Sequence, residues 1–127
     1  MDLIRNNFHG ELPEGLSHLG RLKVLNLTIN NLSGKVPSWL SSFQNLQYLS
    51  HANNSFTGVI PPAICNVSTL KSLSLSFNSL SGKLPIEIGN LQSLKKLSIE
   101  YNYLSGSVPS KIFNISSLEI ISFLSNS

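Results

Sequence analysis

Cysteine, charged side chains and long apolar runs are all scarce in this sequence of 127 residues. The single cysteine, Cys65, excludes an internal disulfide and a zinc site built from CxxC pairs. Charged residues make up 12% of the chain, the net charge is +3, and only Lys95 and Lys96 form an adjacent basic pair, so no nucleic-acid-binding stripe is expected. No apolar run reaches the roughly 18 residues of a membrane span, and the N-terminus MDLIRNNFHG does not have the pattern of a signal peptide.

The sequence does contain a repeat with a period of 24 residues. Asparagine recurs in one register at Asn6, Asn30, Asn54, Asn78, Asn102 and Asn126. Glycine and proline follow the same period at Gly10, Gly34, Gly58, Gly82 and Gly106 and at Pro13, Pro37, Pro61, Pro85 and Pro109. Leucine-type residues keep the register too, and a period of about 20 to 50 residues is typical of solenoids, propellers and arrays.

Each repeat unit, LxxLxLxxNxL-S/T-GxxP, predicts a short strand, a turn and a loop. The alternation places Leu25 and Leu27 on the inner face of the strand and leaves Asn26 and Thr28 outside. The asparagine after the strand turns inward, where its amide can bond backbone groups that the turn leaves unpaired, so stacked copies form an asparagine ladder. The glycine suits a positive φ, and the loop after the proline has room for a single 3₁₀ or α turn.

Two apolar positions in each loop are expected to face the core. They are Leu16, Leu40, Ile64, Ile88 and Ile112, and Leu19, Phe43, Val67, Leu91 and Ile115. One unit cannot bury its own apolar edge, so the units stack with their strands in parallel, about 4.8 Å apart. The expected fold is an α/β solenoid, a right-handed superhelix with a parallel sheet on its concave side and short 3₁₀ or α turns on its convex side.

The segments NLSGKVP, SFTGVIP, SLSGKLP and YLSGSVP carry a narrower signature, L-S/T-G-x-[VIL]-P, which resembles the plant-type leucine-rich repeats. The resemblance covers the whole chain and implies a second short strand that twists the solenoid. It gives one solenoid over residues 1–127, with a partial repeat at 1–21, complete repeats at 22–45, 46–69, 70–93 and 94–117, and a partial repeat at 118–127. Because the chain starts inside a repeat, we expect it to be an internal part of a receptor or a truncated gene product.

The resemblance implies a recognition surface on the extracellular side of the plasma membrane, as in receptor-like kinases of immune or developmental signalling. The expected partners are a protein or peptide ligand and a co-receptor; no cofactor is expected. No Ser/His/Asp set or carboxylate pair converges, and no kinase motif is present. Two alternatives remain: a Ser/Thr kinase domain elsewhere in the parent protein, or a secreted protein similar to polygalacturonase inhibitors.

His51 stands where the other repeats have Leu27, Leu75, Ile99 and Phe123. This inward position allows three interpretations. The histidine is a replacement of leucine that one repeat tolerates, a buried pH sensor, or the sign of a local shift in register.

Five N-x-S/T sequons are candidates for glycosylation: Asn26, Asn31, Asn53, Asn66 and Asn114. Asn66 and Asn114 occupy the same position two repeats apart, on the loop side where a glycan fits. Asn26 and Asn53 are expected to point from the concave strands, where a glycan would obstruct binding.

Three rows of residues are expected to point outward from the concave strands. They are Arg5, Ile29, Asn53, Phe77, Tyr101 and Ser125; Val24, Tyr48, Ser72, Lys96 and Ile120; and Ile4, Thr28, Ala52, Ser76, Glu100 and Leu124. Phe77 and Tyr101 should be neighbours, with Tyr48, Lys96 and Glu100 around them. An exposed aromatic pair flanked by charges is typical of a patch that anchors a peptide or protein, so these five residues are the predicted ligand-binding residues.

The first testable prediction concerns self-association. Both terminal repeats are expected to expose apolar side chains and unpaired strand edges, with Met1, Leu3 and Phe8 at one end and Ile121 and Phe123 at the other. The isolated chain should therefore be poorly soluble or associate end to end, with a mass in light scattering that rises with concentration. A monomer whose mass does not change on dilution would contradict this expectation.

Overall fold

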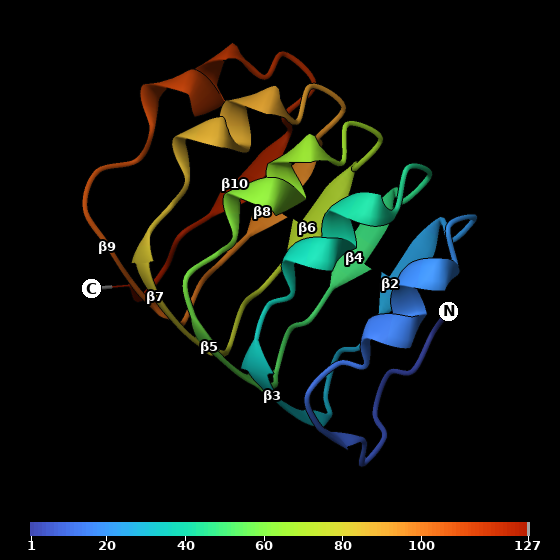
Figure 1. The fold of residues 1–127 in the computed structure, drawn as a ribbon. Coiled ribbons are helices and arrows are strands. Elements are labelled where there is room, and N and C mark those ends of the chain that lie inside the picture. The colour runs from blue at the N-terminus through green and yellow to red at the C-terminus, as the bar shows by residue number, and fades with distance from the viewer. Residues whose placement is uncertain (127) are drawn as a thin grey trace.

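The computed structural model describes residues 1–126 as five successive coils and the start of a sixth (Figure 1). The last residue of the partial repeat 118–127, Ser127, lies outside the described residues. One set of strands comprises β2 (Val24–Asn26), β4 (Tyr48–Ser50), β6 (Ser72–Ser74), β8 (Lys96–Ser98) and β10 (Ile120–Ser122). The other comprises β1 (His9–Gly10), β3 (Asn31–Lys35), β5 (Ser55–Gly58), β7 (Ser79–Lys83) and β9 (Tyr103–Ser105). The 3₁₀ helices are η1 (Glu14–His18), η2 (Ser38–Ser42), η3 (Pro62–Asn66), η4 (Ile86–Asn90) and η5 (Ser110–Asn114).

The concave sheet has the order β10-β8-β6-β4-β2, and every neighbouring pair is parallel. Its register joins residues 24 apart, so that Tyr48 faces Ser72 and Ser72 faces Lys96. The 24-residue period of the sequence therefore equals the offset between paired residues of neighbouring strands. The predicted solenoid is confirmed. Within residues 1–126, no helix has the length and apolar character needed to cross a membrane.

A second parallel sheet, with the order β1-β3-β5-β7-β9, follows the turns. This sheet confirms the second short strand that the S/T-G-x-[VIL]-P signature implies. The repeat glycine at its end has a positive φ in every coil, for example 79° at Gly34 and 76° at Gly58. A side chain at Gly34 would also collide with Glu11 of the preceding coil. Glycine therefore allows both the backbone turn and the close stacking of coils.

The core lies between the two sheets and the 3₁₀ helices. Its strand leucines, Leu25, Leu49, Leu73 and Leu97, are almost completely buried, as are Phe43 and Phe56. Each 3₁₀ helix follows one of the repeat prolines, which keep an extended backbone there. The loop residues predicted to face the core are buried from the second coil to the fifth.

In the first coil two of these core predictions do not hold as stated. Leu19 was expected in the core but is 43% exposed, so this expectation is wrong, and Leu16 is only half-buried. Both residues belong to the η1 coil, which has a neighbouring coil on one side only. Burial at these positions comes from both neighbours, since one coil cannot cover its own apolar edge.

The repeat asparagines join each coil to the one before it through side-chain hydrogen bonds. Asn54 Nδ2 donates to the carbonyl of Leu27 in the preceding coil at 3.0 Å and to that of His51 in its own coil at 3.1 Å. Asn54 Oδ1 accepts a hydrogen bond from the backbone N–H of Leu32, again in the preceding coil, at 3.0 Å. Asn78 forms the same set of bonds one coil later. The amides thereby satisfy backbone groups at a turn that the sheets cannot pair.

His51 is completely buried, and strand pairing around it is the same as in the coils that have leucine at this position. Strand β4 is in register with both of its neighbours, so a local register shift is wrong. The ring stacks on Phe56, with centroids 4.9 Å apart and an interplanar angle of 28°. Neither ring nitrogen has a hydrogen-bond partner. Burial lowers the pKa of His51 from 6.5 to about 4, so the folded protein holds a neutral imidazole.

The second prediction is that His51→Leu stabilises the protein, and does so more strongly in acid. Leucine restores the apolar contact and removes two unpaired nitrogens, which cost on the order of 1–3 kcal/mol. Because the folded pKa of His51 lies below its unfolded value, the unfolded state binds the extra proton, and the wild type loses stability as pH falls from about 6.5 toward 4. From these two pKa values, the advantage of leucine should grow by about 2 kcal/mol between pH 8 and pH 5.

Denaturant unfolding of both proteins at pH 5 and pH 8 measures this difference. A reciprocal control is Leu75→His, which places an imidazole at the equivalent buried position of the next coil. This variant should lose stability, and lose more at pH 5. A His51→Leu gain that is the same at both pH values would show that His51 does not titrate as a buried group.

Candidate functional site

The concave face presents a row of residues with left-handed backbone conformation. Every described coil has one such residue, which lies three residues beyond the end of β2, β4, β6, β8 and β10 in the later coils. Its φ is between 53° and 57°, and none of the six is glycine: Arg5, Ile29, Asn53, Phe77, Tyr101 and Ser125. The backbone N–H of Phe77 donates to the carbonyl of Glu100, and that of Tyr101 donates to the carbonyl of Leu124. These bonds between coils hold the strained conformation, which turns the side chain outward. We call this set the left-handed row.

Within the left-handed row, Phe77 and Tyr101 stack on each other. Their ring centroids are 4.4 Å apart and the rings are inclined by 15°. Phe77 is 44% exposed and Tyr101 is 42% exposed, although both are large aromatic side chains. The stack therefore presents aromatic surface to solvent on the concave side.

A groove lies on the same sheet, along strands β2, β4 and β6 and the start of β8. Its polar lining includes Tyr48, Ser50, Ser72, Ser74 and Lys96. Ser72 lies between Tyr48 and Lys96 in the strand register, so the small serine leaves a gap between two large side chains. The structure thus separates the five predicted ligand-binding residues into two groups, with Tyr48 and Lys96 at the strand starts and Glu100 with the aromatic pair at the strand ends.

Glu100 is half-buried, and its Oε2 atom accepts a hydrogen bond from the Ser122 hydroxyl at 3.0 Å. Its row was expected to point outward throughout, and this expectation is wrong for the middle coils. Ala52 and Ser76 are buried there, and the Ser76 hydroxyl has no partner. The row of Ala52 and Ser76 lies beside the left-handed row, where the backbone begins to turn away from the sheet. Neighbouring residues therefore cover a small side chain at this position.

One row of charged residues was not predicted from the sequence. Lys23, Gln47, Lys71 and Lys95 occupy equivalent positions. The backbone N–H of each of the last three donates to the carbonyl of the equivalent residue one coil before it, for example Lys95 to Lys71 at 2.8 Å. Three lysines dispersed in the sequence thus form a row along the strand starts, beside Lys96. Aligning the repeats at this position would have revealed the row. Glu119 continues it and pairs with Lys95 at 3.4 Å.

Two features of the described part of the chain bear on metal binding and nucleophilic chemistry. Residues 1–126 contain no group of three His, Cys, Asp or Glu residues that could hold a metal ion. Cys65 is buried, and burial together with the nearby charge of Glu87 raises the pKa of its thiol to about 12. A thiol with this pKa is protonated at neutral pH and is a poor nucleophile.

The sequons differ in accessibility. Asn66 and Asn114 are exposed at the ends of η3 and η5, and Asn31 is exposed at the start of β3. Asn53 is exposed in the left-handed row. Asn26 is half-buried, and its Oδ1 accepts a hydrogen bond from the Thr28 hydroxyl at 2.7 Å.

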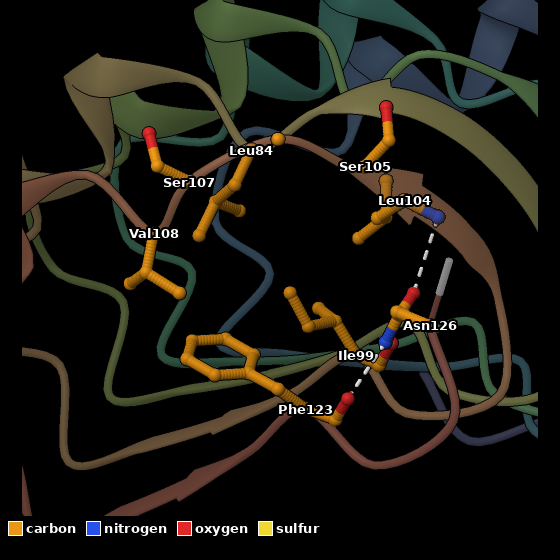
Figure 2. Close-up of a pocket in the computed structure, with 9 residues that line it drawn as sticks. Leu84, Ile99, Leu104, Ser105, Ser107, Val108, Phe123 and Asn126 are labelled. Carbon is orange, nitrogen blue, oxygen red and sulfur yellow. Dashed lines mark hydrogen bonds between the residues drawn. The ribbon is translucent and has the colours of Figure 1, made fainter.

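An apolar pocket of about 90 Å³ lies at the C-terminal coil, and Figure 2 shows the side chains of Phe123, Val108 and Leu84 around it. Asn126 closes one side, where it bonds the backbone of Leu104 and Phe123. The apolar lining residues stand at repeat positions that form the core in earlier coils, such as Leu27 and Val36. We therefore assign this pocket to the core layer of the solenoid and not to a ligand site.

Comparisons with known proteins agree with this architecture. A family model described as leucine rich repeat matches residues 20–80, and a second model with that description matches residues 93–115. Among curated proteins, none matches the chain.

Three solved structures illustrate the similarity. The plant peptide hormone receptor RGFR1, solved in complex with RGF2, is 32% identical with a TM-score of 0.97 over 99% of this chain and 20% of that chain. The Arabidopsis receptor kinase HAESA, solved with the peptide hormone IDA and the co-receptor SERK1, is 31% identical with a TM-score of 0.93 over 96% of this chain and 21% of that chain. The ectodomain of the receptor kinase SOBIR1 from Arabidopsis thaliana is 32% identical with a TM-score of 0.84 over 98% of this chain and 70% of that chain. The chain thus spans about a fifth of the first two receptors.

The third prediction follows from the strain in the left-handed row. Ile29 is β-branched, has a φ of 57° and is 40% exposed. A left-handed conformation costs a β-branched residue on the order of 1–2 kcal/mol, whereas asparagine tolerates it. Ile29→Asn should therefore raise the free energy of unfolding by about 1 kcal/mol, measured by denaturant unfolding.

Val24→Asn is the matched control, because Val24 is 39% exposed on the same face but lies in strand β2. Asparagine is disfavoured in an extended strand, so this variant should be less stable than the wild type. Equal effects of the two substitutions would mean that the φ of Ile29 carries no strain energy.

Proposed function

The chain belongs to the plant-type leucine-rich repeat family, and from this premise we propose that it is part of a cell-surface receptor ectodomain that binds a peptide ligand on its concave sheet. The fold is a recognition module, as in the receptor ectodomains that it resembles. The parent protein would then be extracellular in this region, at the plasma membrane. The plant peptide hormone receptor RGFR1 was solved in complex with RGF2, and HAESA with the peptide hormone IDA, which supports a peptide as the ligand.

The observation that carries the proposal is the exposed stack of Phe77 and Tyr101. Large aromatic side chains are rarely held rigidly in solvent, and exposed aromatic patches are typical of interaction sites. Here the backbone of both aromatic residues has a strained left-handed conformation, and the stacking further restricts the movement of the two rings. A ligand that packs on this pair gains contact area at a small cost in side-chain entropy.

The polar residues around the stack would orient the ligand. Tyr48 and Lys96 line the groove at the strand starts, and Glu100 lies at the strand ends. Because the two groups carry opposite charge, they favour one direction of an extended peptide across the sheet. A co-receptor would then contact the rim of this complex, as a further partner.

Glycosylation fits the same arrangement. We propose Asn66 and Asn114 as the occupied sites, because both are exposed at the ends of 3₁₀ helices, away from the concave sheet. Asn31, at the start of β3, is a further candidate. A glycan on Asn53 would stand beside Phe77 in the left-handed row, and one on Asn26 would stand in the groove, so both should stay unmodified.

The fourth prediction tests the concave face with peptides from a random library displayed on phage and selected against the full chain. Phe77→Ala and Tyr101→Ala should each weaken the selected peptides about thirtyfold, the factor that corresponds to a hot-spot loss of about 2 kcal/mol. The affinities can be measured by isothermal titration calorimetry with synthetic peptides. Unfolding midpoints will show that each variant remains folded.

Tyr103→Ala is the matched control, because Tyr103 is 63% exposed but lies on the second sheet in β9. This variant should bind like the wild type. The proposal fails if no peptide is enriched, or if the selected peptides bind both concave variants normally and lose affinity for Tyr103→Ala.

A further inference from the structure

The stack of Phe77 and Tyr101 is open on the side of the next coil. The separation of 4.4 Å between the two rings is close to the spacing of about 4.8 Å between neighbouring strands, so the stack extends from coil to coil. The next position in the left-handed row is Ser125, whose side chain is too short to cover the ring of Tyr101. The outer face of Tyr101 can therefore receive a third planar group.

The residue before Tyr101 in the sequence carries a carboxylate that reaches the same neighbouring coil. Glu100 directly precedes Tyr101, and its side chain leans toward the coil that contains Ser125, because Oε2 accepts a hydrogen bond from Ser122. Within residues 1–126, the side-chain hydrogen bond to this carboxylate is the one to Oε2. The single ion pair in that range joins Lys95 to Glu119, so no described cation neutralises Glu100.

No positively charged side chain within residues 1–126 forms an ion pair with the Glu100 carboxylate. Lys96 begins strand β8 and lies four residues before Glu100, about 13 Å away along an extended chain. The positions equivalent to Glu100 in the three preceding coils hold Thr28, Ala52 and Ser76, which carry no charge. The end of the aromatic stack thus has a local negative charge that a ligand can satisfy.

We propose that Tyr101 and Glu100 form a binding site for the guanidinium group of an arginine in a peptide ligand. This inference rests on the proposed peptide-binding function and names the ligand chemistry of the same surface. A guanidinium is planar and stacks on aromatic faces, and its N–H groups can donate to a carboxylate at the edge of the stack. A lysine ammonium is compact and strongly hydrated and cannot extend a stack, while a neutral side chain would leave Glu100 unpaired.

The fifth prediction uses the same selected peptides and the full chain. The peptides should contain an arginine whose replacement by citrulline, a neutral side chain of the same shape, weakens binding about tenfold. Replacement by lysine should also weaken binding. In the Glu100→Gln variant, the difference between the arginine and citrulline peptides should disappear. Glu119→Gln removes the same charge at an exposed position and should preserve that difference.

Three further results would decide against the site. Peptides that require Phe77 and Tyr101 but bind equally with arginine or citrulline would overturn the arginine site and leave the proposed function intact. The same holds if the preference for arginine survives in Glu100→Gln. Peptides that ignore Phe77→Ala and Tyr101→Ala would refute the proposed function, and the arginine site with it.

Discussion

The hydrogen bonds of the repeat asparagines are the interaction on which the rest of this solenoid depends. Each amide bonds backbone groups of its own coil and of the coil before it, at the point where the chain leaves the concave sheet. Without these bonds, buried carbonyl and N–H groups would lose their partners, at a cost of about 1–3 kcal/mol each. The bonds fix the spacing of the coils, and this spacing sets the strand register, the burial of the leucines and the alignment of surface rows.

The left-handed row shows that a regular backbone can present side chains of different chemistry. Five of its six residues donate a backbone hydrogen bond to the next coil, and φ stays within a few degrees although the six side chains differ completely. Core positions do not have this freedom, because a buried side chain must fill the space between two coils. His51 is the exception: its neutral ring fits against Phe56 and leaves two nitrogens without partners. Sequence change on the concave face is thus largely uncoupled from the stability of the core.

The period alone predicted much of the fold and the meeting of Phe77 with Tyr101, because parallel strands in register place residues 24 apart side by side. It did not predict the exposure of Leu19, since burial depends on neighbouring coils that the first coil lacks on one side. The burial of Ser76 and the direction of the Glu100 side chain were also missed, because they depend on where the backbone turns away from the sheet. The lysine row could have been predicted from the sequence, but only from an alignment of the repeats at every position.

The constant length of the coils has an evolutionary consequence. Since each asparagine bonds to fixed positions in the coil before it, loss or gain of a whole 24-residue unit leaves every such bond intact, whereas other insertions break the ladder. Recombination between coils can therefore reorder the concave face in one step. Deletion of residues 78–101, for example, would bring Phe77 next to Ser125 and remove both Tyr101 and Glu100. New combinations of surface residues can arise by exchange of intact units, while the backbone scaffold does not change.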